Sequence, residues 1–190
     1  MGPTMVLVPV KAFGEAKRRL APALDPPGRS ELARRLATDV VRAAGPLPVA
    51  VVCDDRDVAD WARALGALVI WEPGRGLNGA VADGVDHLRG LGAQVVAVAH
   101  GDLASPGTLG EVVLKAEPGL ITLVPDVGED GTNVIILPSH TGFRFSYGPG
   151  SFRRHLDEAT RLGLLGPVLR GTALAVDVDL PGDLAGCRPG

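Results

Sequence analysis

Four cationic side chains crowd into a short stretch near the N-terminus that is punctuated by glycine and proline. Lys11, Lys17, Arg18 and Arg19 lie within nine residues of one another, directly after an apolar run. Lysine acts as a point charge and arginine as a bidentate donor, so such a loop is suited to wrap a triphosphate. The alternative is an ordinary solvated basic loop, and from spacing alone the two are evenly balanced. The stretch is not a Walker loop, because the GxxxxGK[ST] pattern is absent.

Acidic side chains follow two later apolar runs. Asp102 comes just after the run that ends before His100, where a carboxylate ligand of Mg²⁺ is expected; capping of the next turn is the alternative, and His100 is more simply structural than a ligand. Near the C-terminus, Asp177 and Asp179 point to one face of an extended chain and repel each other unless a cation is near. We assign Asp177 to the metal and expect Asp179 to cap or turn the chain, leaving open whether it contributes. Asp183 is interpreted as a helix cap.

Two glycine-containing turns form a third candidate site. Gly131–Asn133 precedes a predicted strand, and Gly148–Ser151 precedes a predicted helix. A glycine-rich turn at a helix N-terminus offers free backbone N–H groups and a favourable dipole to an anion. Ser151 would be both cap and ligand there, and Thr132 would add a hydroxyl. Ordinary hairpin and capping chemistry is the alternative.

Two further stretches are candidates for nucleotide contacts. Glu72–Asn78 follows the third predicted strand, and we expect it to contact a nucleobase, with Asn78 as the nucleotide-binding residue; a plain connection is the alternative. Cys53–Asp55 follows the second predicted strand and is placed to face the nucleotide in the same way.

All of these candidates depend on strands and helices that must position them. Apolar runs predict strands at Met5–Val10, Pro48–Cys53, Leu68–Trp71, Gln94–Ala99, Leu120–Pro125, Asn133–Leu137 and Ala173–Val178, and periodicity predicts helices at Ser30–Ala44, Val58–Leu65, Asn78–Leu91, Thr108–Ala116 and Ser151–Leu162. Strands and helices alternate through residue 126, which indicates βαβ units and a parallel sheet covered on both faces. The neighbouring strands between residues 120 and 137 add an antiparallel element. Residues 1–190 are predicted to form a single domain.

The composition excludes several classes of protein. With 46% apolar and 22% charged residues among 190, the chain is globular rather than disordered. A net charge of −3 disfavours nonspecific binding to nucleic acid or to an anionic membrane. No apolar run reaches the roughly 20 residues that span a bilayer, and no secretory signal is visible. Cys53 and Cys187 make no disulfide framework, so we expect reduced thiols in the cytoplasm.

Taken together, the candidates favour nucleotidyl transfer. A nucleoside triphosphate with Mg²⁺ needs the cations and the carboxylates, and a second phosphorylated substrate would use the glycine-containing turns. A dinucleotide-dependent oxidoreductase is disfavoured, because no GxGxxG motif followed by a ribose-binding acid is present.

Five motifs, in order along nearly the whole chain, resemble those of the phospholactate/phosphoenolpyruvate guanylyltransferases of coenzyme F(420) biosynthesis. They are LVPVKAFGEAKRRLAP (Leu7–Pro22), GDL (Gly101–Leu103), GTN (Gly131–Asn133), FSYGPGSFRRH (Phe145–His155) and DVDLPGDL (Asp177–Leu184). The first and fourth are specific to the family. The GDL and DxDxPxDL motifs also occur in related nucleotidyltransferases, such as molybdopterin guanylyltransferases.

The resemblance implies a three-layer, GT-A-like α/β fold with a mostly parallel mixed sheet and helices on both faces. It implies GTP as the nucleotide donor, Mg²⁺ as the cofactor and a small phosphorylated carboxylic acid as the acceptor, with the product passed to a downstream deazaflavin-coenzyme enzyme. Carried over residue by residue, the roles are these: Asp102 and Asp177 bind metal; Thr132, Gly148 and Ser151 hold the acceptor's phosphate; and Lys11, Lys17 and Arg19 surround the phosphates of GTP. Lys11, Lys17, Asp102 and Asp177 are the expected catalytic residues.

Several alternatives stay open at this point. Phosphoenolpyruvate, 2-phospho-L-lactate and 3-phosphoglycerate are not distinguished as acceptors, and neither the number of metal ions nor a homodimer is decided. Family members often read GDLP, whereas Pro106 here is displaced by two residues, which bears on the turn and the acceptor pocket beside Asp102. Another nucleotidyltransferase with a molybdopterin or sugar-phosphate acceptor is the runner-up, and a noncatalytic nucleotide-binding module is a third possibility.

Overall fold

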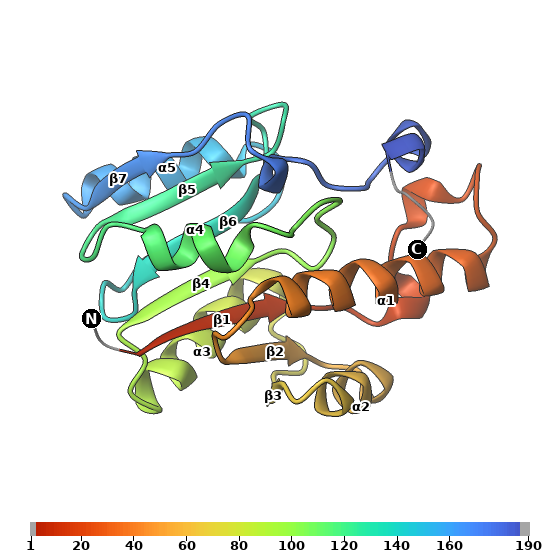
Figure 1. The fold of residues 1–190 in the computed structure, drawn as a ribbon, viewed down its shortest axis with the longest axis horizontal. Coiled ribbons are helices and arrows are strands. Elements are labelled where there is room, and N and C mark those ends of the chain that lie inside the picture. The colour runs from red at the N-terminus through yellow and green to blue at the C-terminus, as the bar shows by residue number, and fades with distance from the viewer. Residues whose placement is uncertain (1–2, 187–190) are drawn as a thin grey trace.

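A seven-stranded mixed sheet with strand order β3-β2-β1-β4-β6-β5-β7 runs through the computed structural model, which describes residues 3–186 (Figure 1). The strands are β1 (Thr4–Pro9), β2 (Val49–Cys53), β3 (Leu68–Trp71), β4 (Val95–Ala99), β5 (Ile121–Pro125), β6 (Thr132–Pro138) and β7 (Leu165–Val168). The α-helices are α1 (Pro26–Ala43), α2 (Arg56–Ala64), α3 (Gly76–Gly90), α4 (Leu109–Lys115) and α5 (Ser151–Arg161). Four short 3₁₀ turns complete the order: η1 (Phe13–Glu15), η2 (Arg18–Leu20), η3 (Ala173–Ala175) and η4 (Pro181–Gly186).

The sheet is parallel on one side of β4 and mixed on the other. Strand β1 pairs in parallel with both β2 and β4, and β2 pairs in parallel with β3. Strand β6 is antiparallel to both β4 and β5, and β7 returns parallel to β5. The central strands are almost wholly buried, as expected for strands covered on both faces. The predicted mostly parallel α/β fold with an antiparallel insertion is therefore confirmed.

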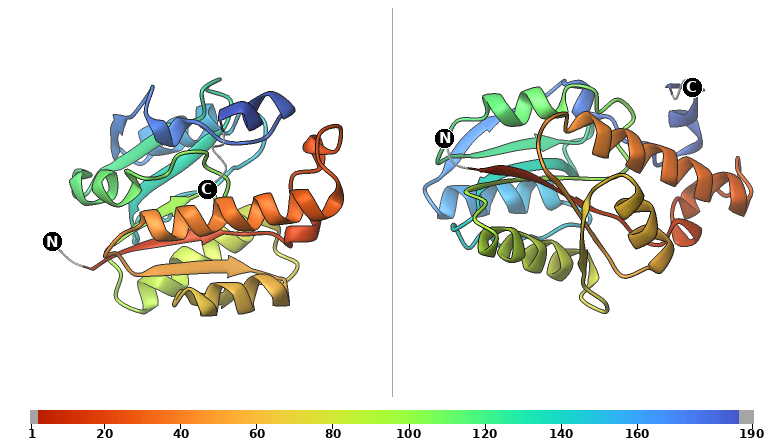
Figure 2. Two further views of the ribbon diagram at one scale, coloured as in Figure 1. Left: turned by 45° about the vertical axis from the view of Figure 1, so that its right-hand side comes forward. Right: turned by 60° about the horizontal axis from the view of Figure 1, so that its bottom comes forward.

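Helices cover both faces of the sheet, which makes three layers (Figure 2). One core cluster joins α1, α2 and α4 to side chains such as Val6, Val8 and Ala97, and the other joins α3 and α5 to the opposite-facing Leu7 and Val98. Because side chains alternate along a strand, consecutive residues of one apolar run supply both cores. Within residues 3–186, no helix has the length and apolar character that crossing a membrane requires.

Helices α1 and α2 each begin directly after an aspartate that caps the helix N-terminus. Helix α1 starts four residues before the predicted Ser30, because Asp25 accepts a hydrogen bond from the Gly28 N–H and two prolines fill the first helical positions. Helix α2 starts at Arg56 because Asp55 accepts from the Val58 N–H. Asp55 is thus a helix cap.

Near the C-terminus one predicted strand is wrong and one strand was not predicted. The expected strand Ala173–Val178 is instead the turn η3 followed by a single antiparallel bridge between Asp177 and Leu103. The true last strand, β7, was not predicted, because its sequence LGPV holds glycine and proline; proline is tolerated there because β7 is an edge strand. Cys53 is buried with a free thiol, whereas Cys187 lies outside the described residues.

Candidate active site

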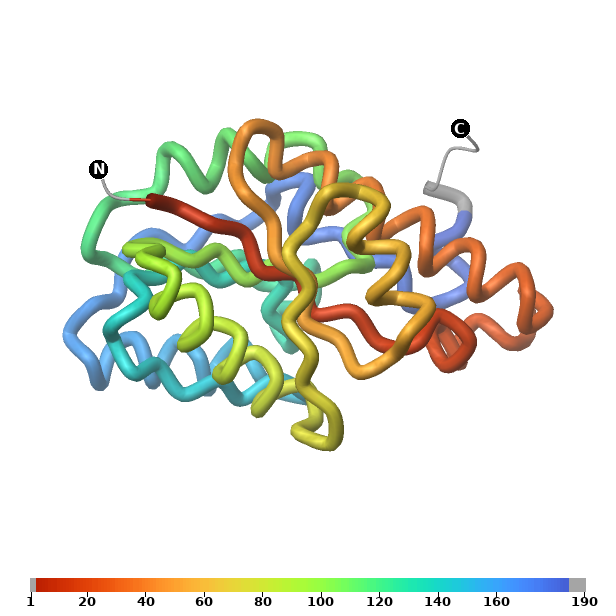
Figure 3. The backbone as a smooth tube through the Cα atoms, turned by 90° about the horizontal axis from the view of Figure 1, so that it is seen from below, coloured from red at the N-terminus to blue at the C-terminus, as the bar shows by residue number. Residues whose placement is uncertain are grey.

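The loop after β1 is held down by a small cluster of its own. Leu20 is fully buried and packs with Leu32 and Leu36 of α1 and with Val178 from the far end of the chain. Figure 3 shows the red segment after β1 and the blue C-terminal segment at the same end of the molecule. Two stretches far apart in sequence are therefore joined beside the ends of β1 and β4.

The C-terminal stretch is set against the end of β4 by backbone hydrogen bonds. The Ala104 N–H donates to the Val176 carbonyl at 2.8 Å, and the Val178 N–H donates to the Asp102 carbonyl at 3.2 Å. Because Val178 faces the buried cluster, its neighbours Asp177 and Asp179 face the opposite way, toward Asp102. The predicted shared face of the two aspartates is confirmed, although the segment is not a regular strand.

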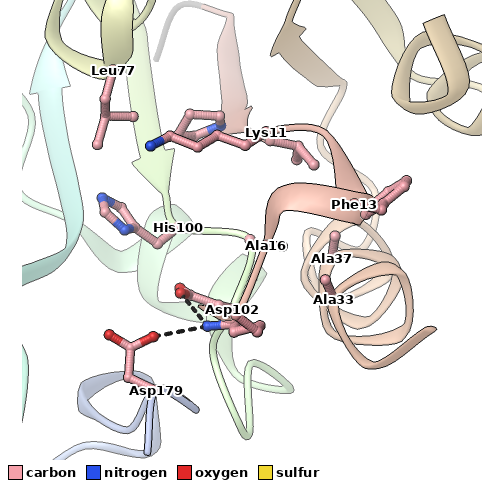
Figure 4. A pocket seen from close by; sticks show the side chains of 13 residues that line it. Lys11, Phe13, Ala16, Ala33, Ala37, Leu77, His100, Asp102 and Asp179 are labelled. Atoms are coloured by element: carbon pink, nitrogen blue, oxygen red, sulfur yellow. Dashed lines mark hydrogen bonds and ion pairs between the residues drawn. The ribbon is translucent and has the colours of Figure 1, made fainter. Parts of the chain in front are cut away.

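Three carboxylates meet at this place. One oxygen each of Asp102, Asp177 and Asp179 can be chosen so that all three lie within 4.8 Å of one another. The Lys17 ammonium donates to Asp102 Oδ2 at 2.7 Å and to Asp179 Oδ1 at 3.0 Å. In Figure 4 the dashed lines mark these contacts at the labelled Asp102 and Asp179. The side chain of Lys17 is only 6% exposed, against 28% for Asp102 and 43% for Asp179. We expected Asp179 mainly to turn the chain, but it is also a member of the acidic cluster.

Lys17 holds an uncommon backbone conformation, with φ 55° and ψ 36° at the start of η2. This left-handed region costs a non-glycine residue free energy and is typical of functional sites. The Leu20 N–H donates to the Lys17 carbonyl at 2.9 Å, and the two ion pairs hold the ammonium in place.

The charges of the cluster shift the pKa values of its members in different directions. Burial alone disfavours the ammonium form of Lys17, but the charge of Asp102 and its hydrogen bond outweigh this and raise the pKa of Lys17. Burial opposes ionisation of Asp102 as well, yet the adjacent Lys17 lowers the pKa of that carboxyl. Burial, followed by the negative charges of Asp102 and Asp179, raises the pKa of Asp177 to about 6. The cluster thus has more negative charge than one lysine offsets.

These residues fit a divalent cation. Hard cations prefer carboxylate oxygens, and three carboxylates meet here around a single ammonium; burial, and then the charges of Asp102 and Asp179, raise the pKa of Asp177. Asp102 and Asp177, the two expected ligands, are both in the cluster, and Asp179 is a third ligand candidate.

Two cavities lie side by side next to the cluster. One of about 250 Å³ is lined by Lys11, Lys17, His100, Asp102 and Asp179, among others. The other, of about 210 Å³, is lined by Asp54 and Glu72 among others, and the two share Pro9, Val10, Lys11 and Leu77. In Figure 4, Lys11 comes from the end of β1, and His100 and Asp102 come from the end of β4. A cavity lined by two lysines and two aspartates thus adjoins an acidic cavity at the carboxyl ends of parallel strands, where open α/β sheets bind ligands.

The other residues predicted to contact the nucleotide differ in their exposure and in their hydrogen-bond partners. Arg19 is 74% exposed, and its guanidinium is 3.7 Å from Asp179. Asn78 lies at the start of α3, where its side-chain oxygen accepts from the Tyr147 N–H at 2.6 Å and its nitrogen donates to the Tyr147 carbonyl at 3.4 Å. The amide of Asn78 therefore ties α3 to the loop before α5. Glu72, which begins the predicted Glu72–Asn78 stretch, lines the acidic cavity.

The turn between β5 and β6 is closed by Asp126, which accepts from the N–H groups of Asp130 at 3.0 Å and Gly131 at 2.7 Å. A Cβ on Gly131 would lie 2.7 Å from the Asp126 carboxylate, so a larger residue there would displace the side chain that closes the turn. Thr132 follows with 2% exposure, and its hydroxyl oxygen lies 3.0 Å from Nδ1 of His155 on α5.

The glycine-rich turn before α5 differs from the expected open anion nest. Gly150, with φ 70°, caps the helix, and Ser151 is its first residue, so the predicted capping role of Ser151 is wrong. The Gly150 N–H donates to Asp130 Oδ1 at 2.9 Å, and the Ser151 N–H donates to the Gly148 carbonyl at 3.0 Å. A carboxylate of the chain itself thus lies where an external anion was expected. Asp183 is not the cap of a following helix; it lies inside η4 and accepts from two preceding N–H groups.

Sequence reasoning missed His155 and Tyr147 and interpreted His100 as structural. His155 was quoted only as the end of a motif, although it is fully buried beside Thr132. The Nε2 atom of His100 and the hydroxyl of Tyr147 are buried without a hydrogen-bond partner among the described residues, and their rings lie 4.8 Å apart. An isolated polar residue at the end of an apolar run was the available signal for His100; the pattern of the sequence offered none for the other two.

The fold is shared with solved nucleotidyltransferases. A nucleotidyl transferase from Methanothermobacter thermautotrophicus superposes with a TM-score of 0.69 at 17% identity, covering 96% of this chain and 94% of that one. A 4-diphosphocytidyl-2C-methyl-D-erythritol synthase superposes with a TM-score of 0.67 at 13% identity, covering 97% and 96%. These likenesses establish the fold.

Sequence comparison then gives the family. Residues 4–187 match the family described as "Guanylyl transferase CofC like", and the chain belongs to it. A phosphoenolpyruvate guanylyltransferase from Rubrobacter xylanophilus is 37% identical over 185 residues, covering 94% of this chain and 90% of that protein. A 2-phospho-L-lactate guanylyltransferase from Methanothermobacter thermautotrophicus is 33% identical over 187 residues, covering 95% and 82%. The resemblance inferred from the five motifs is confirmed.

Proposed function

We propose that this chain transfers GMP from GTP to the phosphate of a small phosphorylated carboxylic acid and releases pyrophosphate. Phosphoenolpyruvate and 2-phospho-L-lactate are the acceptors named for its relatives, and 3-phosphoglycerate is a third candidate. The reaction belongs to coenzyme F(420) biosynthesis, where a downstream enzyme takes up the product. The acidic cluster of Asp102, Asp177 and Asp179 around the Lys17 ammonium, beside the two cavities, is the observation that carries the proposal.

The two cavities suggest how GTP lies. We place its phosphates in the first cavity, where Lys11 and Lys17 line the wall, with the exposed Arg19 beside Asp179 as a further cation. Its base then lies in the acidic cavity. Glu72 and Asp54 there accept hydrogen bonds but cannot donate them, and guanine, unlike adenine, presents two adjacent donor groups on its pairing edge.

The acceptor is proposed to lie between the acidic cluster and the start of α5. Thr132, Gly148 and Ser151 are the residues that the family resemblance assigns to its phosphate. The Asp130 carboxylate accepts a hydrogen bond from the Gly150 N–H, so this N–H group already has an anionic partner from the chain itself. Binding of a phosphate at the same N–H group requires Asp130 to give way.

Transfer is a substitution at phosphorus. An oxygen of the acceptor's phosphate bonds to the α-phosphorus of GTP, and the bond from that phosphorus to the bridging oxygen of the β-phosphate breaks. A phosphate is ionised at pH 7, so no side chain has to remove a proton, and rate acceleration comes from positioning and charge neutralisation. Lys11, Lys17 and Arg19 offset the charge that grows on the leaving pyrophosphate.

The Lys17 ammonium has a second task in this arrangement. It is held between Asp102 and Asp179, so it stays charged and in one place while the substrates change. Asp102, Asp177 and Asp179 would hold Mg²⁺, which when bound neutralises phosphate charge at this place. The three carboxylates therefore define where the anionic substrates meet.

Pyrophosphate release tests the proposal. The chain is incubated with GTP, Mg²⁺ and each of the three acids in turn, and we expect release that depends on one acid and on GTP rather than ATP. Release only with a molybdopterin or a sugar phosphate would indicate another nucleotidyltransferase of the same fold. Binding of GTP without release with any acceptor would contradict the proposal and indicate a noncatalytic module.

A further inference from the structure

The buried side chain of His155 makes a hydrogen bond with each of its two ring nitrogens. It is fully buried on α5, with its ring centroid 4.8 Å from that of Tyr147 and 5.6 Å from that of Phe143. Its Nε2 atom lies 2.9 Å from the backbone nitrogen of Ser146, and its Nδ1 atom lies 3.0 Å from the hydroxyl oxygen of Thr132. Packing and hydrogen bonds together hold the ring in one orientation.

The bond to Ser146 determines which ring nitrogen carries the proton. A backbone N–H can only donate, so Nε2 must accept and is unprotonated. Burial lowers the pKa of His155 to about 4, so the ring is neutral at pH 7. A neutral ring has one proton, which is therefore on Nδ1. It follows that Nδ1–H donates and that the Thr132 oxygen accepts.

The direction of this bond leaves Thr132 with one unused donor. Its oxygen accepts from His155, so its own hydrogen must point elsewhere, and the described residues provide no hydrogen bond for it. Thr132 is 2% exposed, and a buried donor without an acceptor is unfavourable. The missing partner is an acceptor such as an oxygen atom, and the Asp130 carboxylate, two residues before Thr132, is held by the Gly150 N–H instead.

We propose that His155 is a positioning residue, which orients the Thr132 hydroxyl so that its hydrogen is donated to an oxygen of the acceptor's phosphate. This inference rests on the proposed function, because it takes the acceptor's phosphate to lie at Thr132. It adds His155 to the proposed acceptor site and fixes the direction of the hydrogen bond. Thr132 must act as the donor, and a phosphate oxygen can only accept. Each of the two buried side chains then has its hydrogen bonds complete when the acceptor is bound.

A purely structural histidine would be equally buried, so the test separates the two ring nitrogens. An asparagine amide nitrogen reaches the position of Nδ1, whereas a glutamine amide oxygen reaches the position of Nε2. His155→Asn therefore keeps the donor to Thr132, and the matched variant His155→Gln keeps only the acceptor for the Ser146 N–H. We expect His155→Gln to raise the acceptor's KM roughly three- to tenfold, the worth of one hydrogen bond, with little change in the KM for GTP. For His155→Asn we expect the KM for the acceptor and the KM for GTP to stay close to those of the unaltered protein.

Thr132→Val provides the second comparison. If His155 acts through Thr132, then adding His155→Gln to Thr132→Val changes the acceptor's KM no further. Equal effects of the glutamine and asparagine variants, an equal rise in the KM for GTP, or additive effects of the double variant would overturn the inference. An unchanged acceptor KM in Thr132→Val would overturn it as well, while normal pyrophosphate release keeps the proposed function intact.

A measurement on the unaltered protein covers the case in which the variants do not fold. Nitrogen-15 NMR of labelled histidine distinguishes the two neutral forms of an imidazole. We expect His155 to show a protonated Nδ1 at pH 7, both alone and with the acceptor and GTP added. A proton on Nε2 would overturn the inference. A chain that releases no pyrophosphate with any of the three acids would fail the proposed function instead, and the inference with it.

Discussion

Replacing Lys17 by methionine tests whether the acidic cluster is a cation site. Methionine keeps the apolar stem but removes the ammonium, which donates to Asp102 and Asp179 at 2.7 and 3.0 Å. Breaking a buried ion pair costs about 3–5 kcal/mol of stability. The two carboxylates are 28% and 43% exposed, so solvent screens them and we expect about 1–3 kcal/mol instead. For a chain of this size that lowers the melting temperature by about 3–10 °C.

The same variant should respond to a divalent cation more strongly than the unaltered protein does. Without the ammonium, the three carboxylates repel one another, and an added cation relieves this repulsion. Mg²⁺ at ten times its dissociation constant recovers about 1.4 kcal/mol. Differential scanning fluorimetry with EDTA and then with millimolar Mg²⁺ measures both effects.

Arg19→Met is the matched control for Lys17→Met. Its guanidinium is 74% exposed and 3.7 Å from Asp179, so we expect almost no loss of stability. Equal melting temperatures for the two variants in EDTA, or a gain from Mg²⁺ no larger in Lys17→Met than in the unaltered protein, would refute the reasoning.

Further predictions concern the metal ligands, the acceptor and the base. In Asp177→Asn we expect turnover to be nearly abolished while the protein stays folded; normal activity would remove Asp177 from the site. The pKa of Asp177 in the folded chain, about 6, lies above its ordinary value of 3.8, so in EDTA the stability should fall as the pH rises from 4 through 6, and Asp177→Asn should flatten that fall in thermal melts. Ser151→Ala should raise the KM of the acceptor more than that of GTP, and an equal rise in both would contradict the assignment. ITP differs from GTP in lacking the amino group of the base. Glu72→Gln should reduce the ratio of kcat/KM for GTP to kcat/KM for ITP more than Asp54→Asn does. An unchanged ratio in Glu72→Gln would show that the base binds elsewhere.

The sheet could be predicted from sequence because its central strands are uninterrupted apolar runs. The run QVVAVA became β4 and the run MVLVPV became β1, since strands buried on both faces must be apolar throughout. Strand β7 escaped prediction because an edge strand needs fewer apolar residues and tolerates proline. The segment at 173–178 looked like a strand for the same apolar reason, but it pairs through a single bridge and packs as a turn.

The candidate site was partly predictable for a different reason. Asp102 follows a buried strand, so its place at the edge of the sheet follows from the topology. The inclusion of Asp179 depended on which way Val178 packs against Leu20, a contact across the length of the chain that no local pattern contains. The contact of Asp130 with Gly150 is likewise long-range, which explains why the turn before α5 looked like an open anion nest in the sequence alone.

The position of the cation is the most direct test of the account. A crystal grown with a nonhydrolysable GTP analogue and Mn²⁺ in place of Mg²⁺ shows the ion by its anomalous scattering. The account predicts an anomalous peak within coordination distance of carboxylate oxygens of Asp102 and Asp177, with the triphosphate beside Lys11 and Lys17. A peak remote from both aspartates, or a triphosphate bound away from the Lys11–Lys17 loop, would contradict it.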